Sequence, residues 1–288
     1  MADGMFTDKR NYVAASYGTV EDQPIQVETH WTPKPMSLSP YWARAAQTFS
    51  LEHFMYAVPP IDMGCVLIDP SLRRSERCLR MPIKAFGETK FQVPEEFHWL
   101  LPVIARIMFM DAAHHESFKD YYAHLTVDTR EVEAGNTQRV AGWHVDGFQS
   151  GGREPLHEIE RSYLWSLDEP ATEYCVQPFF IDHLRPLHHN IHSEFDKQAV
   201  VPTLQGIAGH IYQIDPYMVH RSPVLVRKMI RTTLRVTFAK TLLTDPVNTV
   251  NMGLPEMNQP VARFELRNTL SVYAGPVPYD RYGLFLVE

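Results

Sequence analysis

A histidine and an aspartate two residues apart, His144 and Asp146, stand in the stretch GWHVDGF at the midpoint of this 288-residue chain. Imidazole and carboxylate groups are ligands of transition metals. Two further His-x-acid pairs occur: His114/Glu116 and His192/Glu194. Because the chain holds 14 His and 34 acidic residues, such pairs also arise by chance. Only their context separates ligands from coincidence.

Local secondary structure distinguishes the three pairs. In a strand, residues i and i+2 point to the same face, and His144/Asp146 end the β-rich run QRVAGWHVD. The stretch around His114 is helical in composition, and in a helix residues two apart diverge by about 200°. The polar segment around His192 is predicted to be a loop. The strand criterion therefore selects His144 and Asp146 as metal ligands.

A third ligand is needed, and the pattern indicates His220. Two His and one carboxylate on one face, with the opposite positions open, form the facial triad of non-haem Fe(II) oxygenases. The 76 residues from His144 to His220 accommodate four intervening strands, which need on the order of 40 residues with their turns. The alternative reading of His220 is a hydrogen-bonded strand histidine.

The strand predicted after His220, RTTLRVTF, carries two arginines on one face. Arg231, Thr233 and Arg235 alternate with apolar or small residues. Guanidinium groups inside a sandwich are costly unless anions meet them, and Arg binds carboxylates through a planar fork. The alternative is a cationic strip on an outer sheet surface.

These residues require a β scaffold, and the amino-acid pattern of the chain is typical of β-strands. Short β-rich runs separated by Gly, Pro, Asp and Asn begin near residue 120. Eight strands are predicted: 121–128, 138–146, 161–167, 173–180, 199–204, 210–215, 217–222 and 230–240. Eight strands match a double-stranded β-helix, the cupin-like jelly roll. The fold class is therefore mainly β.

The predicted organisation is a single domain over residues 1–288. Its jelly-roll core covers about 120–240, after an N-terminal helical elaboration over 1–119 and before a C-terminal extension over 241–288. Helical segments are predicted at 41–57 and 94–118. The helices before residue 120 are expected to pack on one outer face of the sandwich.

Composition excludes several classes of function. A net charge of −7 without Lys/Arg runs argues against a nucleic-acid partner. The apolar stretch 99–110 is too short to span a membrane, and no signal peptide is recognised at the N-terminus. Three Cys at unrelated spacings fit a reducing cytoplasm. We expect a small-molecule substrate, and the sequence does not indicate an oligomeric state.

Together, His144-Val145-Asp146, His220, and Arg231 with Thr233 resemble the Fe(II)/2-oxoglutarate-dependent dioxygenases over roughly residues 120–240. The spacing of Arg231 and Arg235 is similar to taurine-dioxygenase-like members. The stretch WHVDG is similar to phytanoyl-CoA-hydroxylase-like members. The first 120 and the last 48 residues match no particular subfamily, so the substrate is not identified.

The resemblance implies a reaction and a set of roles. His144, Asp146 and His220 would bind Fe(II), and Arg231 with Thr233 would bind the distal carboxylate of 2-oxoglutarate. With O2, and with ascorbate as reductant in vitro, the products would be succinate, CO2 and a hydroxylated substrate. Retention of Asp146 favours hydroxylation, because halogenases of this family have a small residue there; desaturation and ring formation are variants.

Three further residues are predicted to contact the substrate: Arg235, Phe148 and Gln149. Arg235 implies a small polar or anionic substrate, unless an internal acid such as Asp215 or Glu173 pairs with it. Core packing is the alternative for Phe148. Gln149 lies on the Gly-rich segment 146–158, which is either a lid over the site or a solvated connection.

Two other classes of function compete with this reading. One is a metal-binding cupin that does not use 2-oxoglutarate, either an isomerase or a 2-oxoglutarate-independent oxygenase. The other is a non-catalytic interaction protein with the same fold. The complete His/Asp/His set disfavours the interaction protein, and an inward-facing Arg231 disfavours the simple cupin.

Overall fold

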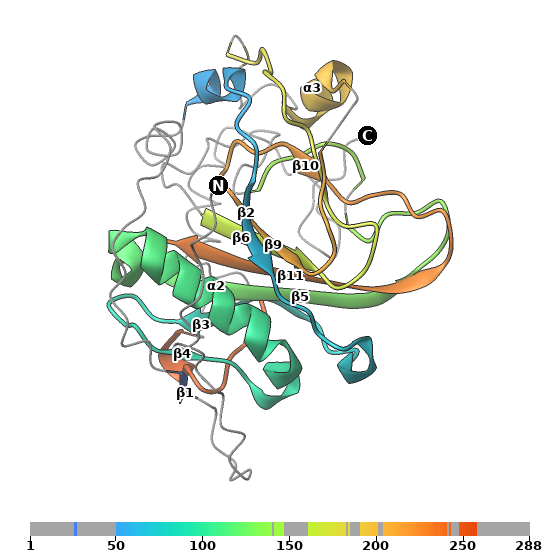
Figure 1. The fold of residues 1–288 in the computed structure, drawn as a ribbon. Helices are drawn as coiled ribbons and strands as arrows, with labels where there is room; N and C mark the ends of the chain where they lie inside the picture. The colour runs from blue at the N-terminus through green and yellow to red at the C-terminus, as the bar shows by residue number, and fades with distance from the viewer. Residues whose placement is uncertain are drawn as a thin grey trace, which may run out of the picture.

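A six-stranded antiparallel sheet forms the centre of the computed structural model (Figure 1). The structure describes residues 26–27, 50–139, 141–146, 161–182, 184, 191–200, 204–240, 242 and 248–257. The strands of this sheet, in spatial order, are β2 (Ile61–Cys65), β9 (His210–Ile214), β6 (Arg161–Ser166), β11 (Met229–Ala239), β5 (Tyr122–Val132) and β3 (Cys78–Lys84). The described part of the chain is thus mainly β.

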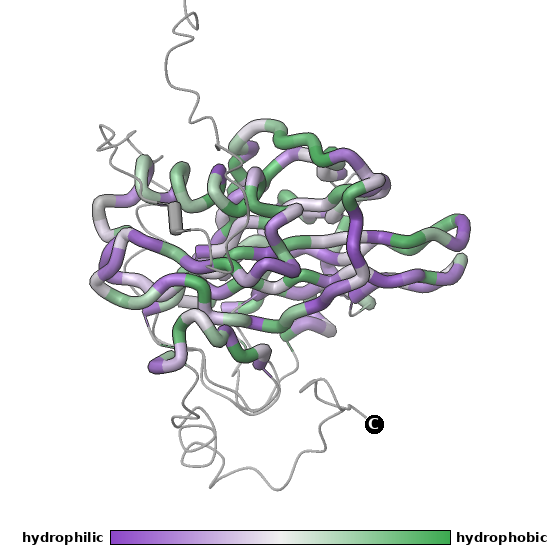
Figure 2. Tube along the Cα trace, turned by 90° about the horizontal axis from the view of Figure 1, so that it is seen from below, coloured by the Kyte–Doolittle hydropathy of each residue, from purple (hydrophilic) through white to green (hydrophobic). Residues whose placement is uncertain are grey.

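One face of this sheet packs on α2 (Leu101–His114), the longest helix among the described residues. Leu234, Val236 and Phe238 on β11 alternate with polar residues and enter a buried core with the apolar side of α2. This alternation is the period of two expected for a strand with two different faces. Figure 2 shows hydrophilic and hydrophobic residues interleaved along the tube. The expectation that helices before residue 120 cover one face is confirmed for α2.

A buried polar network also joins α2 to the sheet. Arg161 on β6 donates to both carboxylate oxygens of Asp111, through Nε and Nη2 at 2.9 Å each. The Tyr163 hydroxyl donates to the same carboxylate at 2.8 Å. The Arg161 guanidinium also lies 3.9 Å from the centre of the Tyr121 ring. Asp111 therefore meets three donors from β6, which joins α2 to the sheet.

The opposite face of the sheet meets a second, three-stranded antiparallel sheet. Its strands, in spatial order, are β10 (His220–Arg221), β7 (Glu173–Tyr174) and β8 (Leu204–Gln205). Tyr174 packs against Tyr212 and Ile214 of β9 and against Met218, with Leu164 of β6 alongside. The six-stranded sheet is therefore a middle layer between α2 and the smaller sheet.

The remaining elements are short. The described two-stranded pairing joins β1 (Gln26–Val27) and β4 (Phe91–Gln92). Helix α3 covers Ile191–Gln198. The described 3-10 helices are η1 (Leu51–Met55), η2 (Pro70–Leu72), η3 (Glu95–Leu100), η4 (Glu116–Asp120) and η5 (Pro255–Met257). Within the described residues, every helix falls short of the length and apolarity needed to cross a bilayer.

The predicted strands at 121–128, 161–167, 210–215 and 230–240 are confirmed, because β5, β6, β9 and β11 lie there. The predictions at 173–180 and 217–222 hold only for the short strands β7 and β10, and β8 shares only Leu204 with the strand predicted at 199–204. The strand predicted at 138–146 is wrong. Gly142 adopts φ +88°, which interrupts extended backbone, and among the described residues there His144 makes an isolated β-bridge.

Two expectations about helices also need correction. The range 1–119, predicted as a helical elaboration, supplies β2 and β3 to the six-stranded sheet. The segment around His192, predicted to be a loop, contains α3, because Ile191 and Phe195 are four residues apart and bury one side of a helical turn. The helices predicted within 94–118 are confirmed by η3, α2 and η4.

Candidate metal centre

The segment that carries His144 and Asp146 is held between α3 and the smaller sheet. Trp143 and Val145 are buried in a core with Ile191 and Phe195 of α3. The main-chain N–H of Trp143 donates to Asp196 of α3 at 2.9 Å. Because successive side chains alternate in extended backbone, His144 and Asp146 point away from this core.

A backbone bridge aligns His144 with His220 on β10. The N–H of His144 donates to the carbonyl of His220 at 3.0 Å, and the N–H of His220 donates to the carbonyl of His144 at 2.9 Å. The two imidazole centroids lie 4.6 Å apart. The pairing thus brings together two residues that are far apart in sequence.

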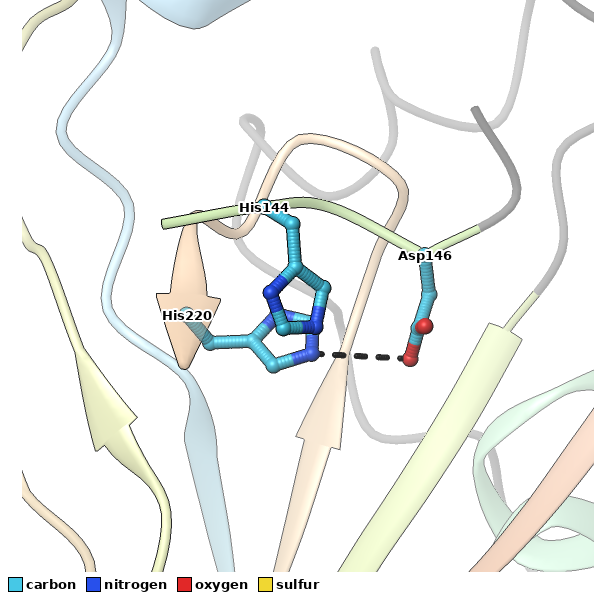
Figure 3. A group of neighbouring side chains, drawn as sticks. All are labelled: His144, Asp146 and His220. Carbon is cyan, nitrogen blue, oxygen red and sulfur yellow. Dashed lines mark ion pairs between the residues drawn. The ribbon is translucent and has the colours of Figure 1, made fainter. Parts of the chain in front are cut away.

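Three side chains converge at this bridge (Figure 3). His144, Asp146 and His220 each offer one ligand atom, and these atoms lie within 4.8 Å of one another. The His220 Nε2 atom is 3.6 Å from the Asp146 Oδ2 atom. Two imidazoles and one carboxylate at this spacing form a donor set that suits a divalent transition metal. The sequence-predicted triad is therefore assembled in space.

Hydrogen bonds to the main chain orient both imidazoles. The Nδ1 atom of His144 lies 3.1 Å from the Gly142 carbonyl oxygen, and that of His220 lies 2.8 Å from the Met218 carbonyl oxygen. A carbonyl accepts, so each Nδ1 carries the proton and each Nε2 keeps a lone pair. Metal-binding histidines are typically fixed in this way.

The protonation states of His144 and Asp146 suit the binding of a metal cation. Burial and the neighbouring His220 lower the pKa of His144 to about 3, so this imidazole is neutral and able to bind metal at pH 7. Burial would raise the pKa of Asp146, but the Arg235 guanidinium and the two imidazoles reverse this and hold that pKa well below its usual range. The Oδ2 atom of Asp146 is buried without a hydrogen-bond partner among the described residues.

Arg235 forms an ion pair with Asp146, the carboxylate of the candidate triad. Its Nη1 atom contacts the Oδ1 atom of Asp146, and both side chains are largely buried. Asp215 and Glu173 were the internal partners considered from the sequence; Glu173 instead pairs with Arg221, and Asp215 accepts a hydrogen bond from the Tyr217 amide. The internal acid that the structure places against Arg235 is Asp146.

Arg231 lies on the same face of β11, four residues earlier, and is fully buried. Its Nη2 atom donates to the Pro170 carbonyl at 2.6 Å, whereas its Nε and Nη1 atoms find no acceptor in the described part of the chain. Burial lowers the pKa of Arg231, against the opposing influence of Asp168 and Glu169. Thr233, which is half-buried, stands between the two arginines on this face.

Further arginines surround the buried carboxylate of Asp128 on β5. Arg130 contacts it through Nε at 2.8 Å and Nη2 at 2.6 Å. Arg77 and Arg139 approach the same carboxylate at 3.3 Å and 3.6 Å. Asp128 is paired with Thr233 in the strand register. This part of the inner face is therefore cationic.

His192 on α3 is a neighbour of the site that was not predicted. Its ring centroid is 6.3 Å from that of His144, and its Nε2 atom is buried without a partner among the described residues. Burial lowers its pKa to about 4. The segment around His192 was predicted to be a loop, so only the helical packing of α3 reveals that His192 lies near His144. The predicted contacts Phe148 and Gln149, with the Gly-rich segment after Asp146, lie outside the described residues.

Comparisons with known proteins were made for the whole chain. No family model matches it, and no curated protein matches it. Among solved structures, the crystal structure of EvdMO1 matches with 21% sequence identity and a TM-score of 0.27, over 40% of this chain and 26% of that chain. The matched part thus spans about a quarter of that chain. A likeness of this extent carries no argument about activity, so function is inferred from the geometry.

Proposed function

We propose that the chain is a non-haem Fe(II)/2-oxoglutarate-dependent oxygenase that hydroxylates an unactivated C–H bond of a small polar or anionic molecule, forming succinate and CO2. The observation that carries the proposal is the cluster of His144, Asp146 and His220, whose ligand atoms lie within 4.8 Å of one another. This is the donor set of the facial triad in non-haem Fe(II) oxygenases.

The donor set fits iron on three counts. Both Nε2 atoms keep their lone pairs, because each Nδ1 donates to a carbonyl. The carboxylate is ionised, and its Oδ2 atom is buried without a partner among the described residues. A buried acceptor without a partner is costly, and a bound cation would remove that cost. Ferrous iron held there would supply the one-electron and O2 chemistry needed to attack an unactivated C–H bond.

Arg231 supports the choice of 2-oxoglutarate as co-substrate. A buried guanidinium needs an anionic partner, and two of its N–H-bearing nitrogens have no acceptor among the described residues. A carboxylate of the co-substrate would accept from this fork. Thr233, on the same face, would donate a further hydrogen bond. The contact of Arg235, Phe148 and Gln149 with the primary substrate stays a prediction.

The proposed scaffold is a jelly roll, with the metal between the six-stranded and the three-stranded sheet. Support comes from the antiparallel order of both sheets and from the His144–His220 bridge at the edge of the smaller one. Tyr174, whose ring centroid lies 6.4 Å from that of His220 in a buried apolar cluster, would exclude water from the metal. Low water access strengthens the ionic contacts inside.

The decisive assay measures succinate from 2-oxoglutarate with Fe(II), ascorbate and O2. Even without the primary substrate, we expect slow succinate formation that stops when O2 or Fe(II) is omitted. His220→Ala should remove this activity. Tight Fe(II) binding without any succinate would favour the alternative, a metal-binding cupin that does not use 2-oxoglutarate. Absence of metal binding would refute both.

A further inference from the structure

The ion pair between Asp146 and Arg235 joins a metal ligand to the centre of the six-stranded sheet. We infer that Arg235 is a positioning residue of the metal centre, which holds the Asp146 carboxylate so that one oxygen, Oδ2, faces the two imidazoles. This inference rests on the metal site of the proposed function. It gives Arg235 a positioning role in addition to the predicted contact with substrate.

The two oxygens of Asp146 have different surroundings. Oδ1 is in contact with the Nη1 atom of Arg235. Oδ2 lies 3.6 Å from the Nε2 atom of His220 and has no hydrogen-bond partner among the described residues. In Figure 3 the carboxylate turns this oxygen toward the imidazole of His220. The carboxylate is therefore already divided into an anchored oxygen and an oxygen available to a metal.

The position of Arg235 in the sheet makes it a firm anchor. It lies on β11, with Thr126 of β5 opposite on one side and Leu164 of β6 on the other. Hydrogen-bonded neighbours on both sides fix its backbone, whereas Asp146 lies outside the named strands. Both side chains are largely buried, with 15% and 18% of their surface exposed. Water therefore competes weakly for the contact.

Anchoring one oxygen has a consequence for coordination. An octahedral metal has six positions, and three protein atoms leave three for other ligands. A keto acid that chelates through two atoms, together with O2, needs all three. A carboxylate that bound through both oxygens would leave only two. With Oδ1 in contact with Arg235, Asp146 would offer the metal one oxygen, Oδ2.

Electrostatics and orientation predict opposite effects on metal affinity. Arg235 is a cation next to a cation site, so its charge alone would weaken metal binding, and its removal would strengthen it. If Arg235 instead acts by orienting Asp146, its removal weakens metal binding, as is typical of groups that orient ligands. The sign of the change therefore decides between a positioning residue and a residue without this role.

Co(II) titration of the full chain, followed through the visible absorption of the bound metal, tests the inference. Arg235→Met should weaken Co(II) binding by roughly 10- to 100-fold and change the absorption intensity, because the number of ligand atoms changes. Arg235→Lys should show a smaller loss, since a lysine keeps a charged donor. The matched control is Arg130→Met, which removes a guanidinium that pairs with Asp128 on the same sheet face; it should bind Co(II) as the unmodified chain does.

Each outcome bears on one claim. Equal or tighter Co(II) binding by Arg235→Met, with an unchanged spectrum, would overturn the positioning role. If that variant does not fold, Arg235→Gln carries the same threshold of about 10-fold weaker binding. Failure of the unmodified chain to bind Co(II) would overturn the metal site itself, and with it the proposed function.

Discussion

Two buried arginines, one on each face of the six-stranded sheet, have opposite surroundings. Arg161 faces α2, donates two hydrogen bonds to Asp111 and lies over the Tyr121 ring. Arg231 faces the smaller sheet and donates one hydrogen bond, to the Pro170 carbonyl. The pKa of Arg161 is raised by Asp111 against the effect of burial, whereas burial lowers that of Arg231.

The different surroundings of the two arginines indicate different roles, a structural role for Arg161 and a proposed binding role for Arg231. The buried guanidinium of Arg161 has its charge neutralised by the carboxylate of Asp111, and this bidentate contact stabilises the packing of α2. A buried guanidinium whose Nε and Nη1 have no acceptor among the described residues is complete only with an external anion. Asp146 Oδ2 and His192 Nε2, from the neighbouring segment 141–146 and from α3, are also buried without a partner among the described residues. The face toward the smaller sheet is therefore the face on which we propose that a ligand binds.

The largest expected effect is on the face proposed to bind a ligand. His220→Ala removes one of three metal ligands and should lower Fe(II) affinity by more than the roughly 10- to 100-fold that is typical of changes beyond the ligands themselves. Turnover should disappear with it. Isothermal titration under anaerobic conditions measures the affinity. Undiminished Fe(II) binding by a folded variant would contradict the triad.

On the face of the sheet that packs against α2, Arg161→Met should destabilise the protein. It leaves the buried carboxylate of Asp111 without its cation, a loss that typically costs about 3–5 kcal/mol. Urea unfolding of the metal-free chain, compared at equal slope, gives the change in the free energy of unfolding. A change below about 1 kcal/mol would show that the contact has the small value of a surface pair.

Arg231→Met sharpens the comparison, because it changes the same residue type on the other face. It should leave the free energy of unfolding nearly unchanged, since an incompletely paired buried charge is replaced by an apolar chain of similar size. The KM for 2-oxoglutarate should rise at least about 30-fold, the equivalent of roughly 2 kcal/mol for one partner of a buried charged pair. If Arg231→Met strongly destabilised the protein and left the KM for 2-oxoglutarate unchanged, Arg231 would have a structural role like that of Arg161. The proposed difference between the two arginines would then be wrong.

A further expected effect concerns pH. Burial, with Arg161 beside it, lowers the pKa of His115 to about 4, against about 6.5 in an unfolded chain. The unfolded state therefore binds more protons between these values, so stability is full above pH 6.5 and falls as the pH drops toward 4. The loss amounts to up to about 3 kcal/mol. His115→Gln should reduce this dependence in the metal-free chain, which unfolding curves at pH 7 and pH 4.5 would reveal; an unchanged dependence would contradict the role of His115.

Residue composition and turn signals identified much of the scaffold. Runs rich in β-forming residues, separated by Gly, Pro, Asp and Asn, predicted β5, β6, β9 and β11. The helical run before residue 120 was equally clear. The short strands β2 and β3 in the N-terminal part were missed, since five to seven residues with irregular register carry little periodic signal.

The metal ligands could be proposed from residue types and spacing alone, even though the strand predicted at 138–146 is wrong. His144 and Asp146 still share one side, because alternation holds in any extended backbone, and the partner strand follows at a distance that a β-sandwich permits. The face of β11 that carries Arg231 and Arg235 followed from the same alternation.

Only the tertiary structure decided which partners these side chains have. Whether a guanidinium meets an internal or an external carboxylate depends on contacts between residues far apart in sequence, such as Asp146 with Arg235 or Asp111 with Arg161. His192 reaches the site because α3 packs against Trp143 and Val145. Spacing along the chain determines the side to which a residue points, whereas long-range packing determines what it meets there.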